Sequence, residues 1–371
     1  MRQVYSLYLH IPFCKHRCAY CDFNTYAGQE DSIPAYVDAL CKEIEFVGQS
    51  VRAERSGSAV EAHTIFFGGG TPSLLSPIQF EKIFHAIRTN FNLLEDSENA
   101  IEANPGTVSL DDLQRLRKIG INRISFGVQS ANTEELRMLE RAHNFFDVIE
   151  AVSNARKAGF DKLNLDLIYG LPEQTLWTWQ RTVRRILDLH PEHISAYALT
   201  LEHGTPFGRW SSKGLLPIPD PDLAAEMYEW ANDAFENAGY QQYEISNWAK
   251  GNSEFKIQNS KFMCRHNLQY WRGLPYLAFG AGGHGCANGY RYSNVIRIKT
   301  YIERLSHPLS FILHPFPLSP AAVNHHKQTT VDDMSEFMMT GLRLTREGVS
   351  SAAFYQRCGR ELTEVYSKEI D

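Results

Sequence analysis

Short apolar runs alternate with helical segments through the first two hundred residues, and this alternation most constrains the fold. The predicted strands fall at residues 6–11, 64–67, 100–103, 123–128, 163–168 and 193–198. Helical patterns lie between them, for example at 34–46, 77–89, 111–118, 147–158 and 176–187. Strands that alternate with helices favour a parallel sheet covered by helices. About six such units fit before residue 200, too few for a closed eight-fold barrel. We therefore expect an α/β fold built on a partial, laterally open (β/α)6 TIM-like barrel.

The pattern changes after residue 200. Residues 203–222 are rich in glycine and proline and lead into a helical pattern at 223–238, and residues 248–272 form an irregular tract. From about residue 325 the pattern is helical again, with a segment at 332–344. We therefore divide the chain into the partial barrel at 1–200, an extension that completes the core at 201–324, and a small, mostly α-helical C-terminal domain at 325–371.

The charge balance bears on the class of partner. The chain has 37 Lys and Arg against 43 Asp and Glu, a net charge of −6, and lacks the basic excess typical of nucleic-acid-binding proteins. No apolar run is long enough to span a bilayer and no signal peptide is recognisable, so we expect a cytoplasmic location. In such a reducing compartment the 7 cysteines need an explanation other than disulfides.

Three of these cysteines lie close together near the N-terminus. Cys14, Cys18 and Cys21 have the spacing C-x3-C-x2-C. Iron–sulfur clusters take thiolate ligands, and three local cysteines leave one iron of a four-iron cube without a protein ligand. An open position on a metal centre usually receives a substrate or cofactor. The alternatives are a zinc site, which would need a fourth ligand such as His10 or His16, and unrelated buried thiols.

Residues suited to binding a small molecule lie at the ends of successive predicted strands. The second strand ends in a glycine-rich turn, Gly68-Gly69-Gly70-Thr71, whose missing side chains would let a ligand approach the backbone. Glu102, Gln129 and Asp166 lie at or near the ends of the next three strands. Each alone would more often make a structural hydrogen bond. Because the carboxyl ends of parallel strands meet at one edge of the sheet, together they predict a binding site there.

These motifs resemble the radical-SAM superfamily, and nearly the whole chain is similar to its coproporphyrinogen-oxidase-like branch. The resemblance implies that Cys14, Cys18 and Cys21 hold a 4Fe-4S cluster whose free iron binds S-adenosylmethionine (SAM). Reduction of such a cluster would cleave SAM to methionine and a 5′-deoxyadenosyl radical. The resemblance also implies a set of SAM contacts, namely Tyr8, Tyr20, Gly69, Gly70, Thr71, Glu102, Gln129, Arg141 and Asp166.

Two readings within this branch compete. The oxidases carry a further cysteine soon after the third cluster cysteine and a long N-terminal extension, whereas this chain reads Cys21-Asp22-Phe23-Asn24 and begins a few residues before its first strand. The segment 266–271 reads H-N-x-x-Y-W and resembles the haem-binding motif of the haem chaperones of the branch. The resemblance implies haem binding near His266, Tyr270 and Trp271, with Cys264 as a second candidate ligand. Judged without this resemblance, such side chains would more often serve only to pack the core.

The resemblance to the haem chaperones implies partners as well. These are haem, haem-accepting proteins such as membrane respiratory subunits, and a reductant protein such as a flavodoxin or ferredoxin, with transient association at the membrane. We expect a scaffold able to cleave SAM reductively, but not coproporphyrinogen oxidase activity. The segment from about residue 325 resembles the start of the family's C-terminal domain. Since the chain ends at Asp371, we expect that domain to be incomplete.

Overall fold

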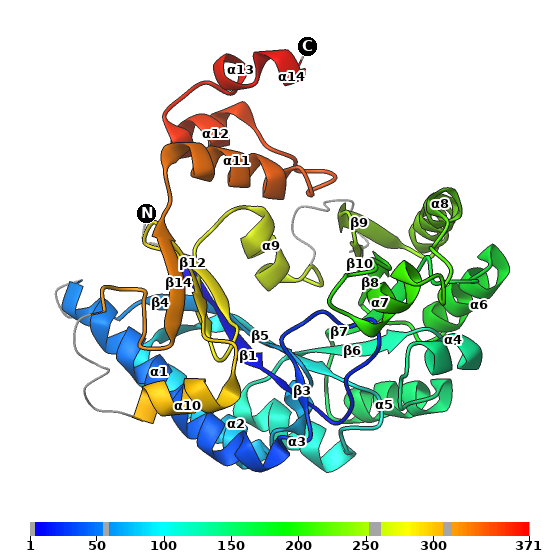
Figure 1. Ribbon diagram of the computed structural model, residues 1–371, viewed down its shortest axis with the longest axis horizontal. Coiled ribbons are helices and arrows are strands. Elements are labelled where there is room, and N and C mark those ends of the chain that lie inside the picture. Colours follow the sequence, from blue (N-terminus) through cyan, green and yellow to red (C-terminus); the bar gives the residue numbers. More distant parts are fainter. Residues whose placement is uncertain (1–3, 55–58, 252–260, 307–313, 371) are drawn as a thin grey trace.

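A single curved sheet organises the protein. The structure is a computed structural model that describes residues 4–54, 59–251, 261–306 and 314–370. The sheet has twelve strands in the order β14-β13-β12-β11-β1-β4-β5-β6-β7-β8-β10-β9. The two ends of this order do not pair with each other, so the described strands form an open sheet and not a closed barrel (Figure 1).

The six predicted strands are confirmed and lie side by side in chain order. Each pairs in parallel with the next, which is the arrangement that helical crossovers produce. Their side chains are buried on both faces over much of their length, which explains the continuous apolar runs in the sequence. Their bounds are β1 Val4–Ile11, β4 Glu61–Gly69, β5 Asn92–Ala103, β6 Arg123–Gln129, β7 Leu163–Tyr169 and β8 His193–Ala198.

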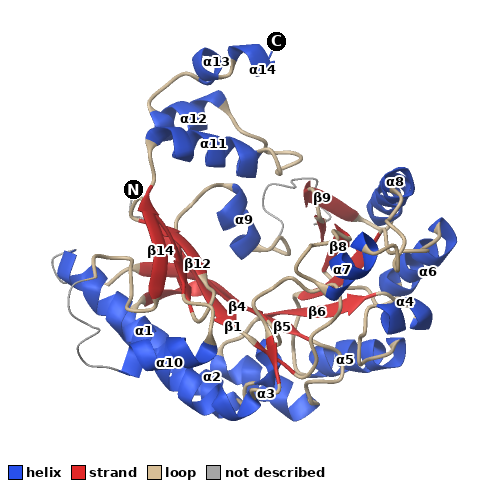
Figure 2. Ribbon diagram, viewed as in Figure 1, coloured by secondary structure: helices blue, strands red, loops and turns tan. Residues whose placement is uncertain are grey.

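Helices cover the outer face of this parallel sheet, as Figure 2 shows. Helix α2 begins with a capping box in which Ser76 and Gln79 satisfy each other's backbone N–H groups. Helix α3 ends at Gly120, whose φ of +123° suits a residue without a Cβ atom. The predicted helices are confirmed as α1 Ile33–Glu54, α2 Pro77–Asn90, α3 Leu110–Ile119, α5 Phe145–Lys157, α6 Leu176–Leu187 and α8 Pro221–Asn237.

The extension adds strands at both ends of the parallel core. Strand β11 (Tyr276–Phe279) pairs in parallel with β1, and β12 (His284–Ala287), β13 (Tyr290–Asn294) and β14 (Ala322–Lys327) follow antiparallel. At the other end β10 (Asn247–Lys250) and β9 (Tyr240–Glu244) continue from β8. Helix α10 (Ile298–Ser306) packs beside α1. The short strands β2 (Phe13–Cys14) and β3 (Tyr26–Ala27) form a separate parallel pair.

Two tracts are more regular than the sequence predicted. The loop-rich stretch at 203–222 contains helix α7 (Pro206–Ser212), and the irregular tract at 248–272 contains the end of β10 and helix α9 (Arg265–Trp271). Both helices have only seven residues, too short for a clear hydrophobic period. Helix α4 (Thr133–Met138) was also missed. Residues 252–260 of the irregular tract lie outside the described part.

The C-terminal segment is helical, as predicted. It comprises α11 (Thr330–Gly341), α12 (Ser351–Cys358), α13 (Leu362–Val365) and α14 (Ser367–Ile370). Helix α11 lies next to α9, and α13 and α14 lie farthest from the sheet (Figure 1). The predicted boundary at residue 325 falls inside β14, and the division into three domains stays a prediction. Among the helices that the structure describes, none is both long and apolar enough to cross a membrane.

Candidate functional site

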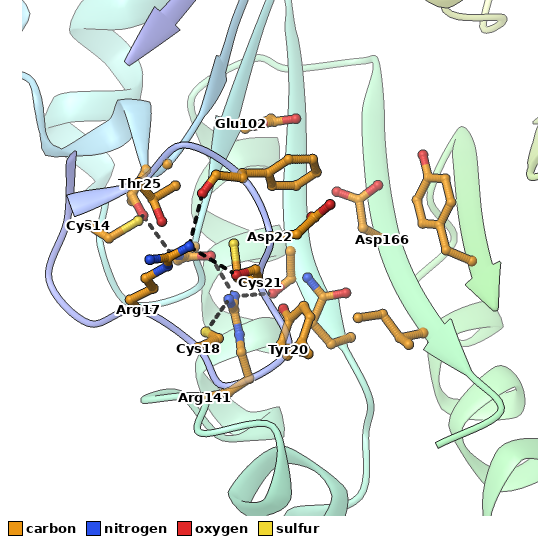
Figure 3. Close-up of a pocket in the computed structure, with 18 of the residues that line it drawn as sticks. Cys14, Arg17, Cys18, Tyr20, Cys21, Asp22, Thr25, Glu102, Arg141 and Asp166 are labelled. Carbon is orange, nitrogen blue, oxygen red and sulfur yellow. Dashed lines mark hydrogen bonds between the residues drawn. The ribbon is translucent and has the colours of Figure 1, made fainter. Parts of the chain in front are cut away.

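The carboxyl edge of the parallel strands holds a cavity of about 460 Å³, which we call the outer cavity. It lies between the loop that carries the three cysteines and the ends of β4 to β8, and Figure 3 shows the cysteines grouped on one side with Asp166 across from them. The structure thus brings together most of the predicted site residues. Those that line the outer cavity are Cys14, Cys18, Cys21, Tyr20, Gly69, Gly70, Thr71, Glu102, Gln129, Arg141 and Asp166.

The cysteine loop is held at its base by backbone pairing. Tyr26 N donates to Pro12 O at 2.7 Å, and the β2–β3 pair closes the loop on itself. At the end of the loop the Asn24 amide donates to Ala281 O at 3.0 Å in the turn between β11 and β12. Asn24 therefore fixes the loop to the extension of the sheet, a role that the sequence analysis did not anticipate.

The three thiols are free, and two of them accept hydrogen bonds from side chains of the outer cavity. Thr71 donates its hydroxyl to Cys14 Sγ at 3.5 Å, and Arg141 Nη1 donates to Cys18 Sγ at 3.6 Å. Burial raises the pKa of the Cys14 and Cys21 thiols, so a bound cation would be needed to hold them as thiolates at neutral pH.

These donors fit an iron–sulfur cluster better than zinc. In the part of the chain that the structure describes, no three His, Cys, Asp or Glu side chains converge closely enough to hold one metal ion. A tetrahedral zinc site requires such convergence, whereas a cubane takes each thiolate on a different iron. His10, one of the candidate zinc ligands, instead bonds the Tyr8 hydroxyl and Asn24 O through its two ring nitrogens.

The glycine turn after β4 lies against the cysteine loop. Gly69 has a φ of +111°, which strongly favours glycine. A Cβ atom on Gly70 would lie 2.5 Å from Phe13 O and 3.0 Å from Cys14 Sγ. A side chain at either position would push the turn away from the cysteines. The turn therefore presents bare backbone beside the thiols, as the sequence predicted.

Two carboxyl groups form the inner wall of the outer cavity. Glu102 Oε2 accepts from Gly69 N at 3.1 Å. Burial, and then the neighbouring charge of Asp166, raise the pKa of Glu102 to about 8. Burial also raises the pKa of Asp166, against hydrogen bonds from Ser125 and other neighbours. Buried carboxyl groups with perturbed pKa values are typical of ligand sites.

Arg141 is the more buried of two arginines that line the outer cavity, the other being Arg17 of the cysteine loop. Nη2 of Arg141 donates to Gly127 O at 2.7 Å and to Asn104 Oδ1, while Nε is buried and has no partner among the described residues. That unsatisfied N–H leaves a donor for the carboxylate of a ligand. Asn104 also donates to Thr71 Oγ1 at 3.1 Å and was missed by the sequence analysis, although its place just after β5 was a usable signal. Gln129, the last residue of β6, also lines the outer cavity, and its backbone has a φ of +66°.

The remaining predicted residues lie elsewhere. Tyr8 does not line the outer cavity, and its hydroxyl bonds His10 Nδ1 at 3.0 Å. His266 on α9 is buried inside the curve of the sheet, with Nδ1 bonded to Thr64 Oγ1 at 2.7 Å and Nε2 bonded to the Tyr270 hydroxyl at 2.9 Å. Burial lowers the pKa of His266 to about 3. In this conformation neither ring nitrogen is available to bind haem iron.

Trp271 and Cys264 also have structural neighbours. The Arg343 guanidinium carbon lies 4.4 Å from the Trp271 ring centroid, a cation–π contact that ties α9 to the segment after α11. Cys264 is 3% exposed and its thiol donates to Glu98 Oε1 at 3.6 Å. Burial, and then Glu98, raise the pKa of Cys264 to about 12, so the thiol is neutral at pH 7.

A chain of buried hydrogen bonds connects Asp166 to the start of α9. Asn164 Nδ2 donates to Asp166 Oδ1 at 2.7 Å, and Asn164 Oδ1 accepts from His193 Nδ1 at 2.6 Å. His193 Nε2 then accepts from the Tyr243 hydroxyl at 2.8 Å, and that hydroxyl oxygen accepts from Cys264 N at 3.3 Å. A neutral His193 with its proton on Nδ1 satisfies every bond. This agrees with burial, which lowers the pKa of His193.

An open α/β sheet that presents three free thiols, a bare glycine turn and an arginine around one cavity defines a class, the radical SAM proteins. The family model described as the radical SAM superfamily matches residues 8–186, and the HemN C-terminal domain matches residues 329–371. The chain belongs to the HemN-like branch of this superfamily, within the HemW family.

The relatives that support this membership cover most of the chain. The heme chaperone HemW of Bacillus subtilis is 38% identical over 97% of this chain and 89% of that protein. The heme chaperone HemW of Haemophilus influenzae is 40% identical over 76% of this chain and 70% of that protein. Among solved structures, the coproporphyrinogen III oxidase HemN of Escherichia coli has a TM-score of 0.79 at 23% identity, covering 100% of this chain and 82% of that chain. That likeness concerns the fold alone.

Proposed function

We propose that this protein is a haem chaperone that binds a 4Fe-4S cluster, SAM and haem, and delivers haem to haem-accepting proteins. The observation that carries the proposal is the outer cavity, where three free thiols meet the glycine turn, Glu102 and Arg141. The haem part rests on the identity to the HemW proteins over nearly the whole chain. Expected partners are a reductant protein and haem-accepting proteins, including membrane respiratory subunits.

Within the outer cavity, different side chains would hold the cluster and contact different groups of SAM. Cys14, Cys18 and Cys21 would hold the cluster, which supplies one electron to the bound SAM. The unpartnered Nε of Arg141 is placed to receive a carboxylate, and the bare backbone of Gly69 and Gly70 admits a ligand close to the thiols. The carboxyls of Glu102 and Asp166 accept hydrogen bonds from a ligand's amino or hydroxyl groups when ionised.

Haem binding by His266 would require a conformational change. Both of its ring nitrogens are engaged by Thr64 and Tyr270, and the ring is stacked on Phe66 with 5.1 Å between centroids. Helix α9 has only seven residues and carries the whole motif, so it would have to move as a unit. We infer that haem meets this motif only after α9 leaves its buried position.

The decisive experiment uses protein reconstituted with iron and sulfide in the absence of oxygen. We expect a 4Fe-4S absorption and electron paramagnetic resonance signal that changes when SAM is added, and haem binding that weakens at least ten-fold in the double variant Cys264→Ala, His266→Ala. Wild-type haem affinity in that variant would show that the assigned haem site is wrong. Zinc, or no bound metal, in the reconstituted protein would contradict the assignment of a 4Fe-4S cluster.

The competing function is oxidative decarboxylation of coproporphyrinogen III. The same protein, given a reductant, SAM and coproporphyrinogen without oxygen, distinguishes the two. We expect no protoporphyrinogen, and its appearance would contradict a chaperone-only function. Transfer of bound haem to an apo-haemoprotein, followed by absorption, tests the delivery step.

A further inference from the structure

One side chain is the common partner of the two groups that donate hydrogen bonds to the thiols. Asn104 directly follows the end of β5 and lines the outer cavity. Its Nδ2 donates to Thr71 Oγ1 at 3.1 Å, and its Oδ1 accepts from Arg141 Nη2. Thr71 in turn donates to Cys14 Sγ at 3.5 Å. Arg141 donates through Nη1 to Cys18 Sγ at 3.6 Å. Asn104 therefore connects the hydrogen bonds made to two of the three thiols.

A tight turn that the local sequence specifies holds the backbone of Asn104. Residues 104–107 read Asn-Pro-Gly-Thr, and Gly106 has a φ of +79°, which is the pattern of a turn with proline at its second and glycine at its third position. Thr107 N closes the turn on Asn104 O at 3.1 Å, and Thr107 Oγ1 donates to the same oxygen at 2.6 Å. Thr107 Oγ1 also lies 2.8 Å from Ser73 Oγ, which joins this turn to the segment after the glycine turn. The side chain of Asn104 thus projects from a fixed position.

Arg141 determines which way round the Asn104 amide lies. A guanidinium group only donates hydrogen bonds, so it must meet the oxygen of the amide. With Oδ1 on Arg141, the Nδ2 group of Asn104 faces Thr71 Oγ1 and donates to it. The single hydroxyl proton of Thr71 cannot point back at a donor, and the acceptor on its other side is Cys14 Sγ. Asn104 therefore aims this proton at a cluster cysteine.

Hydrogen bonds to cysteine sulfurs help to set the reduction potential of an iron–sulfur cluster. Hydrogen bonds strengthen as the acceptor gains negative charge, so a donor stabilises the reduced form of a cluster more than the oxidised form. The positive charge of Arg141 acts in the same direction. Loss of these donors should therefore make a cluster held by Cys14, Cys18 and Cys21 harder to reduce.

We propose that Asn104 is a positioning residue that raises the reduction potential of the bound cluster. It aims the Thr71 hydroxyl at Cys14 Sγ, and it holds the Arg141 guanidinium against Cys18 Sγ. The step concerned is the transfer of one electron from an external reductant to the oxidised cluster, and no bond in the protein forms or breaks. This role of Asn104 rests on the proposed function, because it requires the 4Fe-4S cluster, but it does not depend on haem binding.

The test is the reduction potential of the reconstituted cluster, measured without SAM so that changes in SAM binding do not contribute. Protein is equilibrated without oxygen at a series of potentials set with dithionite and redox mediators, and electron paramagnetic resonance measures the reduced cluster. At the wild-type midpoint we expect Asn104→Leu to lower the ratio of reduced to oxidised cluster about ten-fold, equivalent to about 59 mV for one electron. Asn92→Leu is the matched control, because Asn92 is exposed at the start of the same strand, and it should keep the wild-type potential.

Thr71→Val tests whether Asn104 acts through its neighbour. The substitution removes the hydroxyl with little change in side-chain size, so it should lower the reduction potential by itself. In a double-mutant cycle, we expect Asn104→Leu to produce a smaller further shift in the Thr71→Val background than in the wild type, because both changes remove the same hydrogen bond to Cys14. Equal shifts in the two backgrounds would overturn the path through Thr71.

Iron and sulfide content separates failure of this role from failure of the proposed function. A full complement of cluster with the wild-type reduction potential in Asn104→Leu would overturn the positioning role alone. A wild-type protein that takes up no 4Fe-4S cluster would overturn both. Should Asn104→Leu fail to fold or to take up iron, the same measurement on Asn104→Ala, which removes the amide without adding bulk, decides.

Discussion

Thr64 Oγ1 and His266 Nδ1 lie 2.7 Å apart in the buried centre of the molecule, although 202 positions separate them in the chain. The Thr64 hydroxyl donates to Ser6 Oγ at 2.6 Å, so its oxygen accepts the His266 Nδ1 proton. This fixes the tautomer and leaves Nε2 as the acceptor for the Tyr270 hydroxyl. The pair therefore holds the helix of the haem motif in its buried position.

Thr64→Val should tighten haem binding if His266 is the ligand. The substitution leaves Nδ1 buried without an acceptor, which destabilises the buried position of α9 by about 1–3 kcal/mol. Because apparent affinity follows the population of the competent state, we expect an apparent haem Kd lower by about five-fold or more, measured by haem titration. Thr182→Val, another buried threonine, is the control and should leave the Kd unchanged. An unchanged Kd in Thr64→Val would mean that α9 does not limit access.

Serine at each cluster position should abolish or strongly reduce iron binding. Cys14→Ser, Cys18→Ser and Cys21→Ser each remove one of the three thiolates, and three protein ligands leave no redundancy. The measurement is iron and sulfide content per chain after anaerobic reconstitution. Cys41→Ser and Cys286→Ser, outside the outer cavity, should retain the wild-type content. If Cys41→Ser lost iron as fully as Cys18→Ser, the ligand assignment would fail.

The contribution of Glu102 to the stability of the protein without cofactors should fall as the pH rises from about 5 to 8. The folded state raises the pKa of Glu102 from 4.5 to about 8, so the folded chain keeps a proton that the unfolded chain releases. This stabilisation is complete below pH 4.5 and is lost as the pH passes 8, at up to about 1.4 kcal/mol per pH unit. Urea unfolding at pH 6, 7 and 8 measures it. Glu102→Gln should show a shallower slope, and a slope equal to that of the exposed control Glu150→Gln would refute the assignment.

Asn164→Leu should weaken SAM binding without removing any residue of the outer cavity. Asn164 donates to both Asp166 and Ser125 at 2.7 Å, so leucine leaves the carboxyl of Asp166 without one of its buried donors. We expect a SAM Kd about ten-fold higher by anaerobic calorimetry, equivalent to about 1.4 kcal/mol. Tyr243→Phe, further along the hydrogen-bond chain, is the control and should change the SAM Kd less than three-fold, about 0.65 kcal/mol. Equal effects of the two variants would indicate general destabilisation.

Much of the fold was readable from the sequence because it depends on local patterns. The six parallel strands and the helices between them follow from runs and periods within about ten residues. The strand-end residues could be grouped for the same reason, since parallel strands bring their carboxyl ends to one edge. That rule predicts that Glu102, Gln129 and Asp166 lie around one cavity, and all three line the outer cavity.

The sequence alone determined the C-x3-C-x2-C loop, the order of the parallel strands and the polar edge, because spacing and chain direction specify them. Only the tertiary structure decided that His266 is buried on Thr64, that Asn164 and His193 connect Asp166 to α9, and that Arg123 Nη2 is buried without a hydrogen-bond partner among the described residues. Those facts depend on side chains from distant strands meeting inside the sheet. No local pattern encodes which of them find a partner and which are left without one.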